Sequence, residues 1–121
     1  MHKSHHKIFF FDLDGTLVDS RKDMLHCIHE LRNQYMLAKF EDNKIIPFLH
    51  RGMSELYKNC FNDLIENSNN TNETLNKLKL DYETKYFEKC CVYTECYNEV
   101  KELLIYLSNI GKIIIITNKP E

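Results

Sequence analysis

Two short, wholly apolar runs lie near opposite ends of the chain, at residues 8–11 ("IFFF") and 113–116 ("IIII"). Each run is followed directly by polar residues. Short uninterrupted apolar runs are typical of strands that are buried on both faces, as in parallel sheets. We therefore predict strands over residues 8–11 and 112–117, both buried on both faces and belonging to one parallel sheet.

The segment between these runs carries apolar residues at helical spacing. Asn70 with Glu73 resembles a capping box at the start of a helix, and Gly111 is a typical residue after a helix end. Pro47 separates the first two periodic segments because proline interrupts a helix. We predict four helices, over about residues 24–35, 53–65, 75–86 and 98–110.

The spacing of these elements predicts a helical insertion. Two neighbouring parallel strands need one crossover, and the helix at 98–110 suffices for it. Residues 17–94 are then surplus and have amphipathic helices of their own. We predict an α/β fold in three parts: residues 1–16 form the first strand and its loop, 17–94 an inserted helical domain, and 95–121 the crossover helix and second strand.

Composition excludes several classes of protein. The chain has 121 residues and a formal net charge of −2, which gives no electrostatic reason to expect nucleic acid or an anionic membrane. Its apolar runs are too short to span a bilayer, so we expect no membrane partner and a cytoplasmic location. The five cysteines are odd in number and match no metal or redox spacing, so we expect reduced thiols on apolar faces.

Polar residues follow both predicted strands. Asp12 comes at the end of the first strand, and Thr117 and Asn118 come at the end of the second. Ligands of open α/β sheets bind beyond the carboxyl ends of the strands. Both strands are therefore expected to deliver polar groups to one edge of the sheet, where we place the candidate site.

The residues after the first strand suit phosphoryl transfer. The carboxylate of Asp12 could attack phosphorus to give an aspartyl-phosphate, and the carboxyl of Asp14 could donate a proton and then activate water. Two carboxylates that face a phosphate require a cation, and we expect Asp12 and Asp14 to bind Mg²⁺. Gly15 and Thr16 complete the turn, in which a close backbone approach would let N–H groups face the phosphate.

The second strand is expected to supply further phosphate contacts. The hydroxyl of Thr117 can donate a hydrogen bond to a phosphate oxygen. Backbone N–H groups around Asn118 can do the same.

Two segments resemble a known family. "FDLDGTLVDS" (11–20) resembles the first motif of the haloacid dehalogenase-like hydrolase superfamily, and "IIIITNKP" (113–120) resembles its second motif. Residues 96–121 also resemble the approach to the second motif in phosphoglycolate phosphatases, although Asn98 and Glu99 stand where those proteins usually have Pro-Gly. The resemblance extends from Lys7 to Glu121. The insertion point is similar to that of the helical cap in the same subgroup.

The resemblance implies roles for three residues. Asp12 would be the nucleophile and a Mg²⁺ ligand, Asp14 the general acid and base with its carbonyl also on the metal, and Thr117 the phosphate-binding residue. Because the dehalogenases lack an acid at the position of Asp14, the chain resembles the phosphatase branch. The implied activity is Mg²⁺-dependent hydrolysis of a small phosphorylated metabolite, with pyrophosphatase or sugar-phosphate mutase as alternatives.

The family's third and fourth motifs, which supply a lysine and further metal ligands, would follow Glu121. We therefore expect an incomplete Rossmann-like core, from an interrupted gene, a fragment or one half of a split enzyme, with truncation favoured. Open strand edges attract other strands, so a second polypeptide or self-association is the partner expected there. The alternative to an enzyme is a non-catalytic remnant or a partner-binding fragment.

Overall fold

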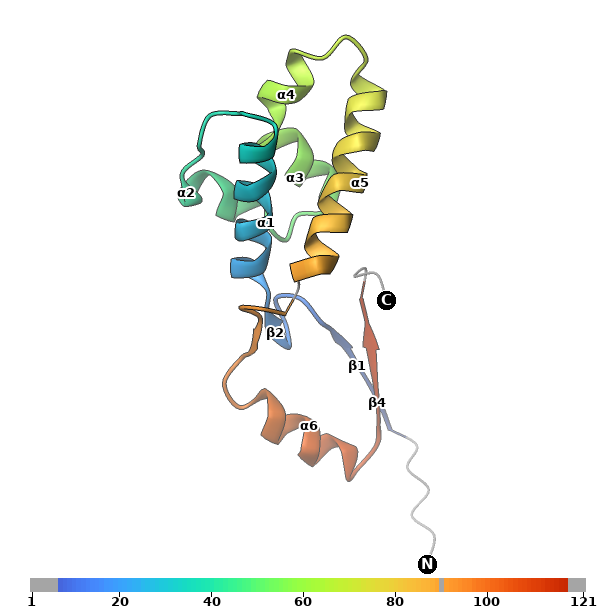
Figure 1. Cartoon of the computed structure of the whole chain (residues 1–121). Helices are drawn as coiled ribbons and strands as arrows, with labels where there is room; N and C mark the ends of the chain where they lie inside the picture. Colours follow the sequence, from blue (N-terminus) through green and yellow to red (C-terminus); the bar gives the residue numbers. More distant parts are fainter. Residues whose placement is uncertain (1–6, 90, 118–121) are drawn as a thin grey trace, which may run out of the picture. The chain divides into compact units, whose positions relative to one another are not determined.

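The computed structural model describes residues 7–89 and 91–117 (Figure 1). The chain divides into two compact units. One unit, which we call the strand unit, combines the segment up to Ser20 with the segment from Glu95 onward. The other, the helical unit, is Arg21–Thr94. Each unit is described by itself.

Two parallel strands form the centre of the strand unit. β1 (Ile8–Asp12) pairs with β4 (Lys112–Ile116), with Ile8 opposite Lys112 and Asp12 opposite Ile116. The helix α6 (Val100–Ser108) precedes β4 and packs against it (Figure 1). The predicted α/β class, with two neighbouring parallel strands and a helical insertion after the first, is confirmed.

The prediction that both strands are buried on both faces is wrong for the described residues. Along β1, Phe9 and Phe11 are half-buried, whereas Ile8 and Phe10 are 52% and 59% exposed. This alternation arises because, among the described residues, one face of the β1–β4 sheet lacks a full apolar cover. The half-buried Phe9 packs closely against Gly111. A Cβ added to Gly111 would lie only 2.7 Å from the ring of Phe9, so the position has no room for a side chain.

A short antiparallel ribbon also belongs to the strand unit. β2 (Val18–Asp19) pairs with β3 (Glu95–Cys96), with Val18 opposite Cys96. The sequence pattern did not predict this ribbon, because two residues per strand are too few to show a period. Its pairing keeps residues 17–20 with the strand unit, although the sequence pattern predicted them to belong to the insertion.

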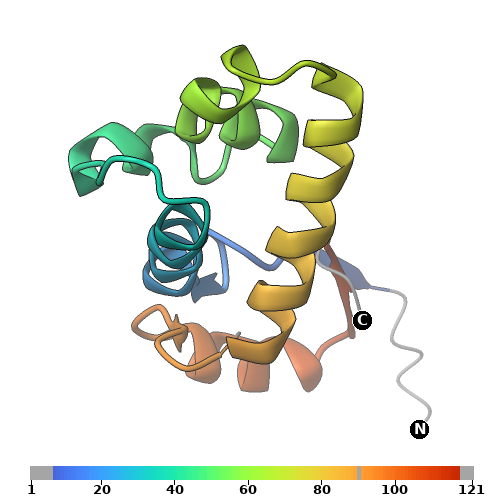
Figure 2. The same ribbon diagram turned by 45° about the horizontal axis from the view of Figure 1, so that its top comes forward.

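The helical unit consists of two long helices and several short ones (Figure 2). The predicted helix at 53–65 is interrupted at Phe61, whose backbone has φ −136° and ψ 25°. One half of the predicted capping box is present, since the Glu73 N–H donates to the Asn70 side chain at 3.2 Å, whereas the Asn70 N–H donates to the Ser68 hydroxyl at 3.1 Å. The elements are α1 (Arg21–Gln34), α2 (Asp42–Ile45), the 3₁₀ helix η1 (Ile46–Phe48), α3 (Met53–Cys60), α4 (Asn62–Glu66) and α5 (Thr71–Lys89).

Most of the buried apolar surface lies within the helical unit, where α1 packs against α5. Cys27 and Cys60 are part of this core, and burial raises the pKa of their thiols to about 12 and about 11. These two thiols match the expected packing on apolar faces, while Cys91 and Cys96 are exposed. The core comprises Met24, Cys27, Ile28, Leu31, Ile45, Leu49, Leu56, Tyr57, Cys60, Phe61, Leu78 and Tyr82.

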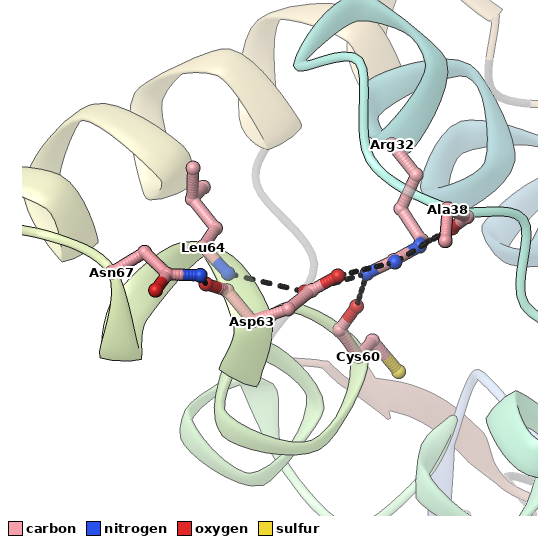
Figure 3. Close-up of polar contacts among 6 residues, drawn as sticks. All are labelled: Arg32, Ala38, Cys60, Asp63, Leu64 and Asn67. Atoms are coloured by element: carbon pink, nitrogen blue, oxygen red, sulfur yellow. Dashed lines mark hydrogen bonds and ion pairs between the residues drawn. The ribbon is translucent and has the colours of Figure 1, made fainter.

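Arg32 connects the end of α1 to the α3–α4 junction (Figure 3). Its side chain is 1% exposed. The guanidinium donates to the carbonyls of Ala38 and Cys60 and binds both carboxylate oxygens of Asp63, at 3.0 and 2.7 Å. It also lies 3.8 Å from the centre of the Phe40 ring. These bonds occupy all five N–H groups, which allows the charge to be buried.

We predict that Glu99→Gly stabilises the protein. Glu99 precedes α6 with φ +67°, a left-handed conformation that favours glycine. The free energy of unfolding should rise by about 0.5–1 kcal/mol, because relief of strain exceeds the entropy that glycine adds to the unfolded chain. Glu102→Gly, inside α6, is the matched control and should lower it by about 1 kcal/mol. Equal losses in urea denaturation of both variants would contradict this account of Glu99.

We predict that Asp63 makes stability sensitive to acid. The hydrogen bond from Arg32 lowers the pKa of Asp63 below its ordinary value. The stabilisation that the ionised Asp63 contributes is therefore complete above the unfolded-state pKa of about 4. It is lost as pH falls through the lower folded-state pKa. Asp63→Asn should reduce stability at pH 7 and flatten its decline below about pH 4 in denaturant titrations. Glu66→Gln, an exposed acid on the same helix, should leave the profile unchanged.

Candidate active site

The parallel pairing of β1 and β4 brings two predicted site residues to one edge of the sheet. Asp12 is the last residue of β1 and lies opposite Ile116, the last residue of β4. Thr117 follows Ile116 directly, so both strands end at the same level. The side chains of Asp12 and Thr117 are exposed at this edge. Strand pairing therefore brings together two residues that are far apart in the sequence.

The chain turns tightly after β1. The carbonyl of Leu13 accepts hydrogen bonds from the N–H groups of Thr16, Leu17 and Val18, at 3.3, 2.9 and 3.1 Å. The Gly15 N–H donates to the Val18 carbonyl at 2.9 Å. These bonds fix the backbone around Asp14, the second acid of the candidate site.

Gly15 provides the conformation that this turn requires. Its φ is +80°, in the left-handed region where a side chain is strained. The Gly15 N–H already has an acceptor in Val18, so the contribution of Gly15 to the turn is its backbone conformation. Leu17 anchors the turn because it is one of the few buried residues of the strand unit, at 4% exposure.

The two carboxylates occupy different surroundings. The Asp12 side chain is exposed, and its Oδ1 accepts a hydrogen bond from the Leu13 N–H at 2.9 Å. Asp14 is half-buried and forms an isolated β-bridge with Val18. The exposed acid is thereby accessible to a ligand, whereas the backbone of the other is held within the turn.

The remaining predicted site residues are placed only in part. Thr16 is exposed in the turn after β1. Asn118 lies outside the described residues, so its predicted contact with phosphate stays a prediction. The proximity of Thr117 to the turn follows from the strand register, because Thr117 is bonded covalently to Ile116.

The oxygen atoms of the candidate site are of the kind that a hard cation binds. Carboxylate and carbonyl oxygens are the protein ligands that Mg²⁺ prefers, and Mg²⁺ usually keeps waters and binds substrate phosphate as well. Asp12 and Asp14 would supply such oxygens. Within residues 7–89 and 91–117, no group of three or more His, Cys, Asp or Glu side chains could hold a metal ion. The described residues therefore offer a partial oxygen-ligand set.

This fold and turn agree with a family match over nearly the whole chain. Residues 9–121 match the family model described as haloacid dehalogenase-like hydrolase, and the chain belongs to this family. The match includes the turn after β1 and the end of β4. The resemblance inferred from the two sequence motifs is thus confirmed.

Similar proteins are phosphatases of about twice the length. The chain is 30% identical to the phosphoglycolate phosphatase of Colwellia psychrerythraea over 116 residues, which is 94% of the chain and 51% of that protein. It is also 30% identical to the phosphoglycolate phosphatase of Mannheimia succiniciproducens over 97% of the chain and 54% of that protein. An N-acetylmuramic acid 6-phosphate phosphatase of Pseudomonas aeruginosa is 24% identical over 94% of the chain and 49% of its own length. The chain spans about half the length of these relatives.

Solved structures show the same fold. A crystal structure described as a predicted phosphoglycolate phosphatase of Haemophilus somnus superimposes with a TM-score of 0.78 and 26% identity, covering 98% of the chain and 54% of that protein. A haloacid dehalogenase-like hydrolase of Streptococcus pneumoniae gives a TM-score of 0.76 at 22% identity, covering 93% of the chain and 49% of that protein, and supports the fold alone. Within the described residues no helix is both long and apolar enough to cross a membrane.

Sequence reasoning missed two buried charged residues. Arg32 and Asp23 are 1% and 5% exposed, and each binds a segment distant in the sequence. Arg32 lies on the predicted first helix and Asp23 directly before it, where a charged residue is ordinarily read as solvent-exposed. Their only sequence signal is position: the buried residues Met24, Ile28 and Leu31 adjoin them on α1.

We predict that Gly15→Ala destabilises the turn after β1. A non-glycine residue at φ +80° should lower the free energy of unfolding by about 1–2 kcal/mol. Gly15→Asn is the matched control, because asparagine tolerates the left-handed region and should cost less. Chemical denaturation of both variants measures the difference. A loss for asparagine as large as that for alanine would contradict a conformational requirement at this position.

Proposed function

We propose that the protein containing this chain is a Mg²⁺-dependent phosphomonoester hydrolase that acts through an aspartyl-phosphate on Asp12. One observation carries the proposal. The exposed Asp12 carboxylate ends β1 at the edge where β4 also ends, directly before a tight turn that contains a second acid. Membership of a hydrolase family and similarity to phosphatases support it.

In the first step, an oxygen of the Asp12 carboxylate attacks phosphorus while the ester P–O bond breaks. Asp14, in its protonated form, gives its proton to the leaving oxygen, so the alcohol departs neutral. In the second step, water attacks phosphorus and loses a proton to the Asp14 carboxylate. The bond between phosphorus and Asp12 breaks, which releases phosphate and restores both acids.

The charge of the phosphoryl group requires partners besides the two acids. Asp12, through its carboxylate, and Asp14, through its backbone carbonyl, would hold Mg²⁺, which when bound offsets the repulsion between carboxylate and phosphate. The hydroxyls of Thr16 and Thr117 and backbone N–H groups around Asn118 are the proposed phosphate contacts. Gly15 is proposed to assist by shaping the loop, because its φ is positive and its N–H already donates to the Val18 carbonyl.

The proposed substrate is a small phosphorylated metabolite, and phosphoglycolate is the first compound to test. Several relatives named as phosphoglycolate phosphatases support this choice, and one named for N-acetylmuramic acid 6-phosphate provides the second compound. Pyrophosphate and hexose phosphates test the pyrophosphatase and mutase alternatives. A cytoplasmic location is part of the same proposal.

We predict that Asp12→Asn abolishes phosphatase activity in the protein that contains this chain. An amide cannot serve as the nucleophile, so kcat with p-nitrophenyl phosphate and Mg²⁺ should fall by at least about 1,000-fold. Asp14→Asn should also lower kcat, because proton transfer typically contributes about 100- to 10,000-fold. Removal of Mg²⁺ with EDTA should abolish turnover reversibly.

Asp42→Asn is the matched control, because it makes the same chemical change at an exposed acid of the helical unit. It should leave kcat within about twofold of the unaltered protein. Trapping of ³²P on the unaltered protein at acid pH, and its absence in Asp12→Asn, would test the intermediate directly. Full turnover by Asp12→Asn would end the proposal, and the 121-residue chain assayed in parallel reports whether it suffices alone.

A further inference from the structure

The chain passes between its two units at two points, after Ser20 and before Glu95. These points are far apart in the sequence, because the whole helical unit lies between them. We define the two crossing segments as residues 17–23 and 93–97. Each segment makes hydrogen bonds to the other, on the strand-unit side and on the helical-unit side.

On the strand-unit side, the crossing segments form the β2–β3 ribbon. Val18 pairs with Cys96, and Asp19 pairs with Glu95. The Tyr97 N–H donates to the Leu17 carbonyl at 3.1 Å, which extends the pairing by one bond. An isolated ribbon of this length is marginal in water. Glu95 and Cys96 are exposed, so side-chain burial on β3 contributes little to holding the ribbon together.

On the helical-unit side, one carboxylate joins the same two segments. Asp23, in the first turn of α1, is 5% exposed. Its Oδ1 accepts the Tyr93 N–H at 3.0 Å, and its Oδ2 accepts a hydrogen bond from the Thr94 hydroxyl. The hydrogen-bonded residues are 70 and 71 positions apart in the sequence. Hydrogen bonds to a buried carboxylate are among the stronger ones in proteins, so this contact can constrain both segments.

We propose that Asp23 is a latch that keeps the two crossing segments paired, including the β2–β3 ribbon. Thr94 is bonded covalently to Glu95 of β3, and Asp23 lies four residues after Asp19 of β2. Holding Thr94 at Asp23 therefore brings the two ribbon strands together at one end, while the Tyr97–Leu17 bond holds the other end. Loss of the latch frees the ends of a loop of about 70 residues, whose closure must then rest on a marginal ribbon.

A simpler role for Asp23 predicts a different outcome. An acid in the first turn of a helix is stabilised by the helix dipole, without any partner across the chain. That role would leave the ribbon unaffected when Asp23 is replaced. The two accounts therefore differ in one observable, the protection of the Tyr97 amide, which lies four residues from Tyr93 and bonds to Leu17.

The experiment is amide hydrogen exchange by NMR on the protein that contains this chain, with three variants. Asp23→Ala should accelerate exchange of both the Tyr93 and the Tyr97 amides by at least about tenfold. Asp23→Asn retains one acceptor oxygen and should have a smaller effect. Thr94→Val removes only the hydroxyl bond and should accelerate the Tyr97 amide by less than Asp23→Ala.

Two amides serve as internal references. The Lys112 N–H bonds to Lys7 in the sheet, and the Tyr35 N–H bonds to Leu31 at the end of α1. Both should change by less than about twofold in Thr94→Val, which keeps the charge and most of the volume of the site. An unchanged Tyr97 amide in Thr94→Val and Asp23→Asn, with only Tyr93 accelerated, would overturn the proposal. Because the readout is exchange and not turnover, its outcome is independent of the proposed phosphatase activity.

Discussion

The parallel pairing of β1 with β4 is the constraint on which the candidate site depends. The acids of the first turn and the threonine after β4 come from opposite ends of the sequence, and only the register of the two strands brings them to one edge. A shift of one residue would move each side chain to the other face of the sheet. The chemistry proposed for Asp12 therefore requires the correct strand register as well as the aspartate side chain.

The two units are stabilised by different means. The helical unit has an extensive apolar core and a buried Arg32 whose donors are all bonded. In the strand unit the buried apolar residues, within the part of the chain described, are Leu17 and Val100. Leu17 belongs to the turn after β1, and Val100 begins the helix that leads to β4. The little apolar burial of this unit is thus placed next to the elements that position the candidate site.

Much of the architecture could be predicted from the sequence, because apolar runs and helical periods are local signals. The parallel strands, the helical insertion and the cap at Asn70 follow such signals. Three features could not be predicted this way: the interruption at Phe61, the β2–β3 ribbon and the exposed face of β1. The first two depend on packing and pairing over short segments. The third depends on how many strands and helices surround β1, which its own residues do not encode.

The polar residues divide in the same way, between those of the candidate site and the buried charges of the helical unit. Asp12, Asp14 and Gly15 are recognisable because acids and glycine directly after an apolar strand are unusual. Arg32 and Asp23 were missed because their roles arise from acceptors and donors 31 and 70 residues away. Nothing in the neighbouring residues distinguishes them from charges on a solvated helix. A single sequence thus reveals the candidate site residues more readily than the buried charged residues of the helical unit.

The β2–β3 ribbon has a consequence for how such chains can diversify. Because Val18 lies opposite Cys96, the chain leaves the strand unit and returns to it at neighbouring positions. Any inserted segment whose two ends fit this pair can connect them. The inserted segment can differ in length and architecture without stretching the strands. Variation of the inserted segment can therefore leave the edge at which β1 and β4 end unchanged.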